Sequence, residues 1–130
     1  MTYQLKPIGL IRTPYSTLDE CPRNIEESGP VCRVIVNTEF KDALSGLDPG
    51  HRILILYWMD QASFSELILP SRKTGERKGI FALRTPQRPN PIGIAKVPIE
   101  SIDGNCIYVK GLDCLDKTPL IDIKPTRRPS

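Results

Sequence analysis

Apolar residues in this chain fall into short runs separated by turn-forming residues, a pattern typical of β-strands. Residues 31–36 are rich in β-branched side chains, which favour strands. Residues 53–59 are apolar at every position, which predicts a strand buried on both faces. Further strands are predicted at residues 4–12, 78–83, 94–102, 105–110 and 120–123.

Prolines and glycines limit where these strands can lie. Pro7 and Gly9 predict that the first strand is an edge or bulged strand, because proline cannot donate a hydrogen bond to a neighbour. Pro98 predicts a bulge or an edge for the strand that contains it. The pair Asp103-Gly104 predicts a compact hairpin turn.

Helix signals are weak in this sequence. Thr38 is a candidate cap for a short helix over residues 39–44, with Gly46 as its stop. Many short strands without long alternating helices predict a mainly β fold: a single-domain antiparallel β-barrel with one or two short helices and no Rossmann scaffold. One domain is expected to cover residues 1–130, with a loose tail at residues 127–130.

The bulk properties of the chain exclude several classes of protein. It has no run of about 18 apolar residues, which a membrane-spanning helix needs, and its N-terminus lacks the pattern of a secretory leader. The cysteines contain no pair at the C-x-x-C spacing of a zinc site. They are Cys21, Cys32, Cys106 and Cys114. We therefore expect reduced thiols in a cytoplasmic protein with no metal centre and no membrane partner.

Charge is distributed unevenly along the chain. The net charge of +3 is too small to indicate a nucleic-acid partner by itself. Residues 71–88 nevertheless hold six cations and one anion, whereas residues 19–27 hold four anions and one cation. The basic segment is suited to phosphate contact. On charge alone, a solvated loop is the simpler interpretation.

The segment at residues 79–93 carries the most informative pattern. An apolar run ends in a loop where Pro86, Pro89 and Pro91 restrict φ and remove backbone donors, so the loop cannot enter a sheet interior or a helix. The same loop holds three polar side chains: Arg84, Arg88 and Asn90. It is either a rigid platform that presents these groups to a ligand or a proline-rich turn with incidental arginines.

Five motifs in chain order carry a resemblance to a known family. They are PIGLIRTPY at 7–15, CPRN at 21–24, LSGL at 44–47 with the strand that follows it as far as Gln61, RTPQRPNPIG at 84–93 and GLDCLDKTPLIDIKP at 111–125. Together they resemble the TrmO/TsaA-like proteins, which use S-adenosylmethionine to methylate N6 of threonylcarbamoyladenosine in tRNA. The resemblance implies a β-barrel that binds this cofactor, acts on the tRNA anticodon loop and forms a homodimer.

The usual cofactor fingerprints are missing, since the chain has no G-x-G-x-x-G, no Walker A loop and no H-E-x-x-H zinc motif. Asp113 and Asp116 are candidate acceptors for the cofactor's amino group or ribose, although turn formation also explains them. Arg23 and Arg84 are candidate bidentate partners for its carboxylate. The resemblance implies a wider set of cofactor-binding residues: Pro22, Arg23, Asn24, Asp60, Gln61, Arg84, Ile94, Lys110, Gly111, Leu112 and Asp113.

Methyl transfer to a weakly nucleophilic N6 depends on alignment and is helped by a general base. Asp60 and Asp113 are the candidate catalytic residues, and Asp116 and His51 are further candidate bases. His51 begins an apolar strand, so a structural histidine is the favoured interpretation. Tyr57 lies within the same strand and is interpreted as core rather than as a stacking partner for a base.

The proline loop has a structural alternative to ligand binding. Arg88 and Asn90 either contact a ligand or brace the loop through backbone hydrogen bonds. Bracing suits Asn90 better, because short amides bond locally in turns.

Three features depart from the family pattern. Asp60 stands where the family often has histidine before Gln61, and Lys117 replaces a glycine, which predicts a less extreme turn. The chain stops shortly after Pro125, so no additional C-terminal domain is expected, and that domain would be expected to help bind tRNA. The open alternatives are a methyltransferase for a small molecule or another RNA, and a non-catalytic module that binds cofactor or RNA.

Overall fold

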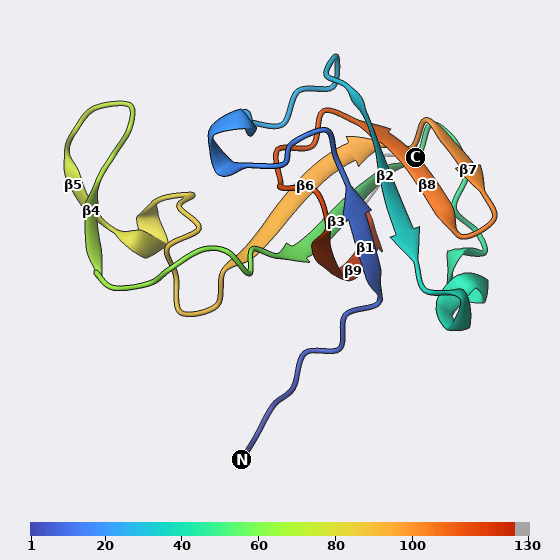
Figure 1. Ribbon diagram of the computed structural model, residues 1–130, viewed down its shortest axis with the longest axis horizontal. Coiled ribbons are helices and arrows are strands. Elements are labelled where there is room, and N and C mark those ends of the chain that lie inside the picture. The colour runs from blue at the N-terminus through green and yellow to red at the C-terminus, as the bar shows by residue number, and fades with distance from the viewer. Residues whose placement is uncertain (127–130) are drawn as a thin grey trace.

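The computed structural model describes residues 1–126 and consists of one curled antiparallel sheet with a separate two-stranded arm (Figure 1). In spatial order the seven strands of the sheet are β6 (Ile92–Pro98), β3 (Arg52–Trp58), β9 (Thr118–Pro125), β1 (Gly9–Arg12), β2 (Val31–Val36), β8 (Cys106–Lys110) and β7 (Ser101–Asp103). The arm pairs β4 (Ile68–Pro70) with β5 (Arg77–Gly79). The expected loose tail at 127–130 lies outside the described residues.

The mainly β class is confirmed, but the sheet does not close into the predicted barrel. Hydrogen-bonded pairing ends at β6 on one side and at β7 on the other. β7 has only three residues, and β6 ends at Pro98, which has no N–H to donate. β6 approaches β8 without pairing to it, so the sheet curls around its core and remains open.

One face of the curled sheet forms the core, because side chains alternate between the two faces of each strand. The inward set includes Ile11, Val34, Ile53, Ile55, Val97, Ile107 and Leu120, all fully buried. The prediction that residues 53–59 are buried on both faces was wrong. Ile53, Ile55 and Tyr57 are buried in the core and Met59 packs against it, whereas Leu54, Leu56 and Trp58 are half-buried on the outer face.

The first strand also differs from its prediction. β1 begins at Gly9 rather than at residue 4, and it lies between β9 and β2 instead of at an edge. Pro7 cannot donate to a neighbouring strand, so regular pairing starts after it, with the Ile8 N–H bonded to the Leu120 carbonyl at 2.8 Å. The edge predicted from Pro98 is confirmed, since β6 is the first strand of the sheet.

The short helices are all of the 3₁₀ type in the described chain. They are η1 (Leu18–Glu20), η2 (Thr38–Leu44) and η3 (Ile80–Ala82). η2 is the helix predicted at 39–44, although Asn37 rather than Thr38 is its cap residue. η3 occupies part of the strand predicted at 78–83, which β5 fills only as far as Gly79.

The last strand contains an irregularity that serves the core. Tyr57 of β3 pairs with Leu120, whereas the preceding Leu56 pairs with Asp122, so β9 carries one extra residue at Ile121. Such a bulge changes which side chains face inward. It allows Leu120 and Ile123, three residues apart, both to pack against the core.

All four cysteines are free thiols, and Cys32 and Cys114 are buried. Burial raises the pKa of the Cys114 thiol to about 12. None of the helices in residues 1–126 is long and apolar enough to cross a membrane.

The turn before β9 was predicted to be relaxed by a lysine, and this was wrong. Lys117 adopts φ +68°, in the left-handed region that glycine tolerates best. The turn is held from both sides, since the Lys117 N–H donates to the Ile11 carbonyl at 2.8 Å and the Asp116 N–H donates to the Tyr15 carbonyl at 2.8 Å. The surrounding bonds therefore impose a conformation that the lysine itself disfavours.

Replacing Lys117 with glycine is expected to stabilise the protein. The left-handed conformation costs a non-glycine residue roughly 1–2 kcal/mol, and the greater backbone entropy of glycine in the unfolded chain offsets part of this gain. We expect K117G to raise the free energy of unfolding by about 0.5–1 kcal/mol in urea titrations. The control K96G, at an exposed position of β6, should lower it. A loss of stability in both variants would contradict the strain at Lys117.

Candidate functional site

The candidate site centres on Asp113, in the connection between β8 and β9. The Tyr57 hydroxyl donates a hydrogen bond to Oδ1 of Asp113 at 2.9 Å. Burial raises the pKa of Asp113, and the hydrogen bond from Tyr57 and the positive charge of Arg84 offset this only in part. The result is a half-buried carboxyl group with raised proton affinity, held at one end of the sheet.

Tyr57 is held in place by Gly93, the last residue of the proline-rich motif. The two residues face each other on β3 and β6, and Tyr57 is only 3% exposed. A Cβ on Gly93 would lie 2.9 Å from Cδ2 of the Tyr57 ring and closer still to two other ring carbons. The motif therefore ends in glycine because the ring that orients Asp113 occupies the space of a side chain.

Gly111 joins the segment 21–30 to the segment that carries Asp113. It has φ +75°, and a Cβ there would overlap the backbone carbonyl of Glu26. The Glu26 N–H donates to the Gly111 carbonyl at 3.0 Å, and the Gly111 N–H donates to the Pro30 carbonyl at 2.9 Å. The space beside Gly111 is thus occupied by the chain itself.

This junction brings the Pro22-Arg23-Asn24 segment toward Asp113. Burial raises the pKa of the Cys21 thiol, and the negative charge of Asp113 is the second cause of that rise. Burial also raises the pKa of Tyr15, with a smaller contribution from Asp113. Arg23 and Asn24 lie two and three residues after Cys21 and are exposed.

The proline loop supplies Arg84 and is braced by Arg88. Nη1 of Arg88 donates to the carbonyls of Leu83 at 2.8 Å and Thr85 at 3.1 Å, and its guanidinium lies 5.6 Å from the centre of the Phe81 ring. Arg88 therefore performs the bracing expected mainly of Asn90, whose side chain makes no hydrogen bond within residues 1–126. Arg84 remains exposed, with its charge directed at Asp113 and Tyr57.

Asp60 and Gln61 lie at the same end of the sheet. They follow β3 in an exposed turn. That turn is tied to the proline loop, because the Met59 N–H donates to the Pro91 carbonyl at 2.8 Å. Both side chains are accessible to a ligand that approaches Arg84.

Three other predicted residues do not turn their side chains toward Asp113. Leu112 is fully buried in the core. Lys110 lies on the outward side of β8, with Nζ 3.5 Å from Oε1 of Glu100. Ile94 is on the outward side of β6, the side opposite Gly93 and Tyr57. Leu112 and Lys110 can contribute backbone atoms to a site around Asp113, whereas Ile94 faces a different surface.

Asp116, a second candidate acceptor, is engaged by the fold. Its Oδ1 accepts hydrogen bonds from Nε of Arg12 at 2.7 Å and from the Thr13 N–H at 3.0 Å. Burial alone would raise the pKa of Asp116, but these bonds outweigh it, so the pKa is lowered. Asp116 acts as a structural anchor for the chain that follows β1.

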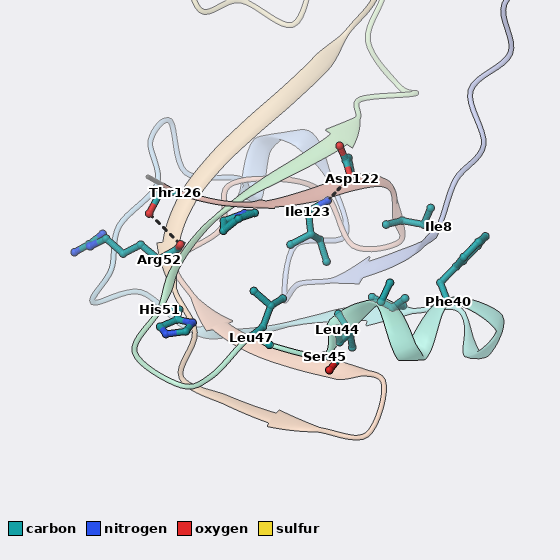
Figure 2. A pocket seen from close by; sticks show the side chains of 14 residues that line it. Ile8, Phe40, Leu44, Ser45, Leu47, His51, Arg52, Asp122, Ile123 and Thr126 are labelled. Atoms are coloured by element: carbon teal, nitrogen blue, oxygen red, sulfur yellow. Dashed lines mark hydrogen bonds between the residues drawn. The ribbon is translucent and has the colours of Figure 1, made fainter. Parts of the chain in front are cut away.

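An apolar cavity in the described chain lies elsewhere, at the opposite end of β3 (Figure 2). It measures about 410 Å³ and is lined mainly by apolar side chains such as Ile8, Leu44, Leu47 and Ile123, with His51 at its side. Tyr57 is six positions after His51 along an extended strand, which corresponds to about 20 Å. Nδ1 of His51 accepts a hydrogen bond from the Asp48 N–H at 3.3 Å. The histidine and this cavity therefore stand apart from Asp113.

Tyr57 and Gly93 are the site components that sequence reasoning did not assign. Tyr57 was interpreted as core, and it is indeed buried, but its hydroxyl also holds Asp113. A tyrosine rather than phenylalanine in an apolar strand is the signal available from sequence, because a buried hydroxyl requires a partner.

Comparison with known proteins agrees with the five sequence motifs. Residues 10–128 match the family described as the tRNA-methyltransferase O N-terminal domain. The chain belongs to this family, and the predicted family is confirmed.

Three relatives illustrate the extent of the match. The chain is 44% identical over 120 residues to a probable S-adenosyl-L-methionine-binding protein, VirR of Rhizobium radiobacter, with 92% of this chain and 69% of the relative covered. It is 30% identical over 128 residues to the tRNA (adenine(37)-N6)-methyltransferase of Rattus norvegicus, with 92% of this chain and 30% of the relative covered. The crystal structure of TrmO from Pseudomonas aeruginosa is similar with a TM-score of 0.78 and 28% identity, covering 98% of this chain and 57% of that one. The chain thus spans little more than half of that TrmO and under a third of the rat enzyme.

Adding a methyl group at Gly93 is expected to destabilise the protein. Because the Tyr57 ring is buried and cannot move aside freely, G93A should lower the free energy of unfolding by about 1–3 kcal/mol, the usual cost of overpacking. Gly79 is the matched control, since a Cβ there would meet only the Leu67 carbonyl at 4.0 Å. Denaturant unfolding of the two variants gives the comparison, and equal stabilities would refute the packing argument.

The two aspartates are expected to affect stability with opposite signs at neutral pH. The raised pKa of Asp113 contributes stability that is present below the ordinary value of 3.8 and is lost as the pH rises through the folded-state pKa. The lowered pKa of Asp116 contributes stability that is present above 3.8 and is lost as the pH falls through its folded-state pKa. At pH 7 we therefore expect D113N to be more stable than the parent protein and D116N to be less stable. For D116N the loss should be about 1 kcal/mol, because solvent screens the ion pair with Arg12, whose side chain is 39% exposed.

Thermal unfolding between about pH 3 and pH 7 tests this pair of variants. D113N should approach the stability of the parent protein at the acid end, because Asp113, with its raised pKa, is then protonated in the parent. The deficit of D116N should begin to shrink only as the pH falls below 3.8, because the pKa of Asp116 is lowered. Shifts of the same sign at pH 7 would contradict the assignment of Asp113 to a site and of Asp116 to the fold.

Proposed function

We propose that this chain binds S-adenosylmethionine beside Asp113 and Arg84 and methylates N6 of threonylcarbamoyladenosine in the tRNA anticodon loop. The observation that carries the proposal is the Tyr57-bound carboxyl group of Asp113, close enough to Arg84 for the arginine charge to lower its pKa. Relatives named as S-adenosyl-L-methionine-binding proteins and as a tRNA methyltransferase support this assignment. The family description supports it as well.

The donor set suits the cofactor. A bidentate arginine is the usual partner for a carboxylate, and Arg84 and Arg23 are both exposed for this role. Asp113 offers an acceptor for an ammonium or a ribose hydroxyl, and Asn24 and Gln61 add exposed amides. The remaining members of the predicted set are Pro22, Asp60, Lys110, Gly111 and Leu112, of which Lys110, Gly111 and Leu112 would act through backbone atoms. Ile94 would take part only through the outward surface of β6.

The chain's own residues would supply orientation and proton transfer. The bound cofactor provides an electrophilic methyl group on a sulfonium sulfur. Tyr57, whose pKa burial raises far above neutrality, stays protonated and keeps Oδ1 of Asp113 fixed. A carboxylate with raised proton affinity is a better general base, so Asp113 is assigned the N6 proton. Asp60 is the second candidate for this role, from its exposed turn.

A homodimer is part of the proposal. Ile92 and Ile94 are 39% and 41% exposed on the outward side of β6, and subunit contacts commonly bury apolar side chains of this kind. Analytical ultracentrifugation of the chain measures the oligomeric state directly.

Cofactor binding and methyl transfer test the function in two stages. Calorimetric titration with S-adenosylmethionine should show that R84A and D113A lower the affinity by about 10- to 100-fold, the effect of losing one hydrogen bond to a charged group. R33A, at an exposed position of β2, is the matched control and should bind normally. Unchanged affinity in R84A and D113A would remove the site.

The acceptor is identified by incubation with labelled cofactor. Label is expected in tRNA that carries threonylcarbamoyladenosine and not in tRNA that lacks it, with the product nucleoside identified by mass spectrometry. Label in small molecules or in other RNA would overturn the substrate but keep the methyltransferase. Cofactor binding without transfer to any acceptor would indicate a non-catalytic module.

A further inference from the structure

The β4–β5 arm, residues 68–79, extends away from the seven-stranded sheet (Figure 1). It is a two-stranded hairpin that pairs only with itself within the described chain. Its tip is closed by hydrogen bonds between Ser71 and Glu76 and between Gly75 and Ser71, both at 2.8 Å. An exposed hairpin of this kind contributes little to the core, so its side chains need another explanation.

The arm carries four cations that the fold does not use. They are Arg72, Lys73, Arg77 and Lys78, against the single anion Glu76. The ion pairs found among residues 1–126 involve other lysines and arginines. None of the four side chains donates a hydrogen bond to the described chain or lies over an aromatic ring.

Arg88 provides the contrast within the same basic segment. Its guanidinium is committed to the Leu83 and Thr85 carbonyls and to the Phe81 ring. Arg88 therefore has the hydrogen-bond and ring partners that are typical of a structural arginine. The arm cations differ, because Arg72, Lys73 and Arg77 are exposed, Lys78 is half-buried, and none of them has such partners in the described chain.

Two exposed aromatic residues flank the arm in the sequence. Phe64 precedes β4 and is 43% exposed, and Phe81, in η3 after β5, is 79% exposed. Cations that follow a phosphate backbone, together with exposed rings on which bases stack, are the features of surfaces that bind single-stranded nucleic acid. η3 leads within two residues to Arg84, so this surface is continuous with the candidate site.

We propose that the arm is an RNA-binding element whose four cations contact the phosphate backbone of the substrate outside the methylation site. The identity of the RNA in this inference rests on the proposed function. The binding surface on the arm is defined independently of that function, by its four cations. A second copy of this chain is the less favoured occupant. Two such tips would repel each other, although Leu67 and Ile68 expose apolar surface at the arm's base.

The salt dependence of tRNA binding tests the proposal quantitatively. Each phosphate contact contributes about 0.7–0.9 to the slope of log affinity against log salt concentration. The double variants R72Q/K73Q and R77Q/K78Q should each reduce that slope by about 1.4–1.8 relative to the parent protein. The control R33Q/K41Q removes the same charge from exposed positions of β2 and η2 and should leave the slope unchanged.

Further measurements on the same variants separate this inference from the proposed function. S-adenosylmethionine affinity should be unchanged in the arm variants, and the KM for tRNA should rise while kcat at saturating tRNA is kept. Methyl transfer with a parental salt slope in both arm variants would overturn the arm's role and leave the function standing. An arm-dependent slope without any methyl transfer would support the arm and refute the function.

Two other outcomes also count against the arm. Equal losses of slope in the arm variants and in R33Q/K41Q would show diffuse charge rather than a defined surface. A change of oligomeric state in the arm variants, with the slope kept, would assign the arm to self-association.

Discussion

The hydrogen bond from Tyr57 to Asp113 links the sheet to the loop that carries the candidate chemistry. It depends on Gly93, because any side chain there would occupy the volume of the tyrosine ring. It also determines the electrostatics, since burial raises the proton affinity of Asp113 while Tyr57 and Arg84 moderate that rise. Strand β3, the proline-rich motif and the Asp113 loop therefore form one unit, although they are far apart in the sequence.

The sequence predicted the elements whose evidence is local. The β-branched run at 31–36 became β2. The predicted hairpin turn does connect β7 and β8, but it consists of Gly104 and Asn105, with φ +61° at Gly104, because Asp103 still pairs with Cys106. The misplaced elements depend on tertiary context. β1 became a central strand because pairing starts just after Pro7. Only one face of β3 is fully buried, because its side chains alternate and those on the outer face are half-buried. Closure of the barrel could not be predicted from local sequence pattern, because it depends on whether the two edge strands, β6 and β7, pair with each other.

The candidate site was predictable in its chemistry and less so in its geometry. The Asp113 segment and Arg84 were identified from motif and charge, and their side chains do lie close enough to interact. The side-chain directions of Ile94 and Leu112 could not be predicted, because the face on which an apolar side chain lies depends on strand register and not on residue type. The choice between Arg88 and Asn90 as the bracing residue could not be predicted either, because only coordinates reveal which of two polar neighbours reaches a carbonyl oxygen. Ligand contacts for all of these residues stay predictions.

The contact between Gly111 and Glu26 has a consequence for biogenesis. The loop at 21–30 is synthesised well before Gly111, its docking point. Contacts of such long sequence separation slow folding, because closing the chain between them costs entropy. A nascent or truncated chain that lacks β8 and Gly111 would hold the loop unanchored, so this corner of the molecule assembles only after residue 111 has been synthesised.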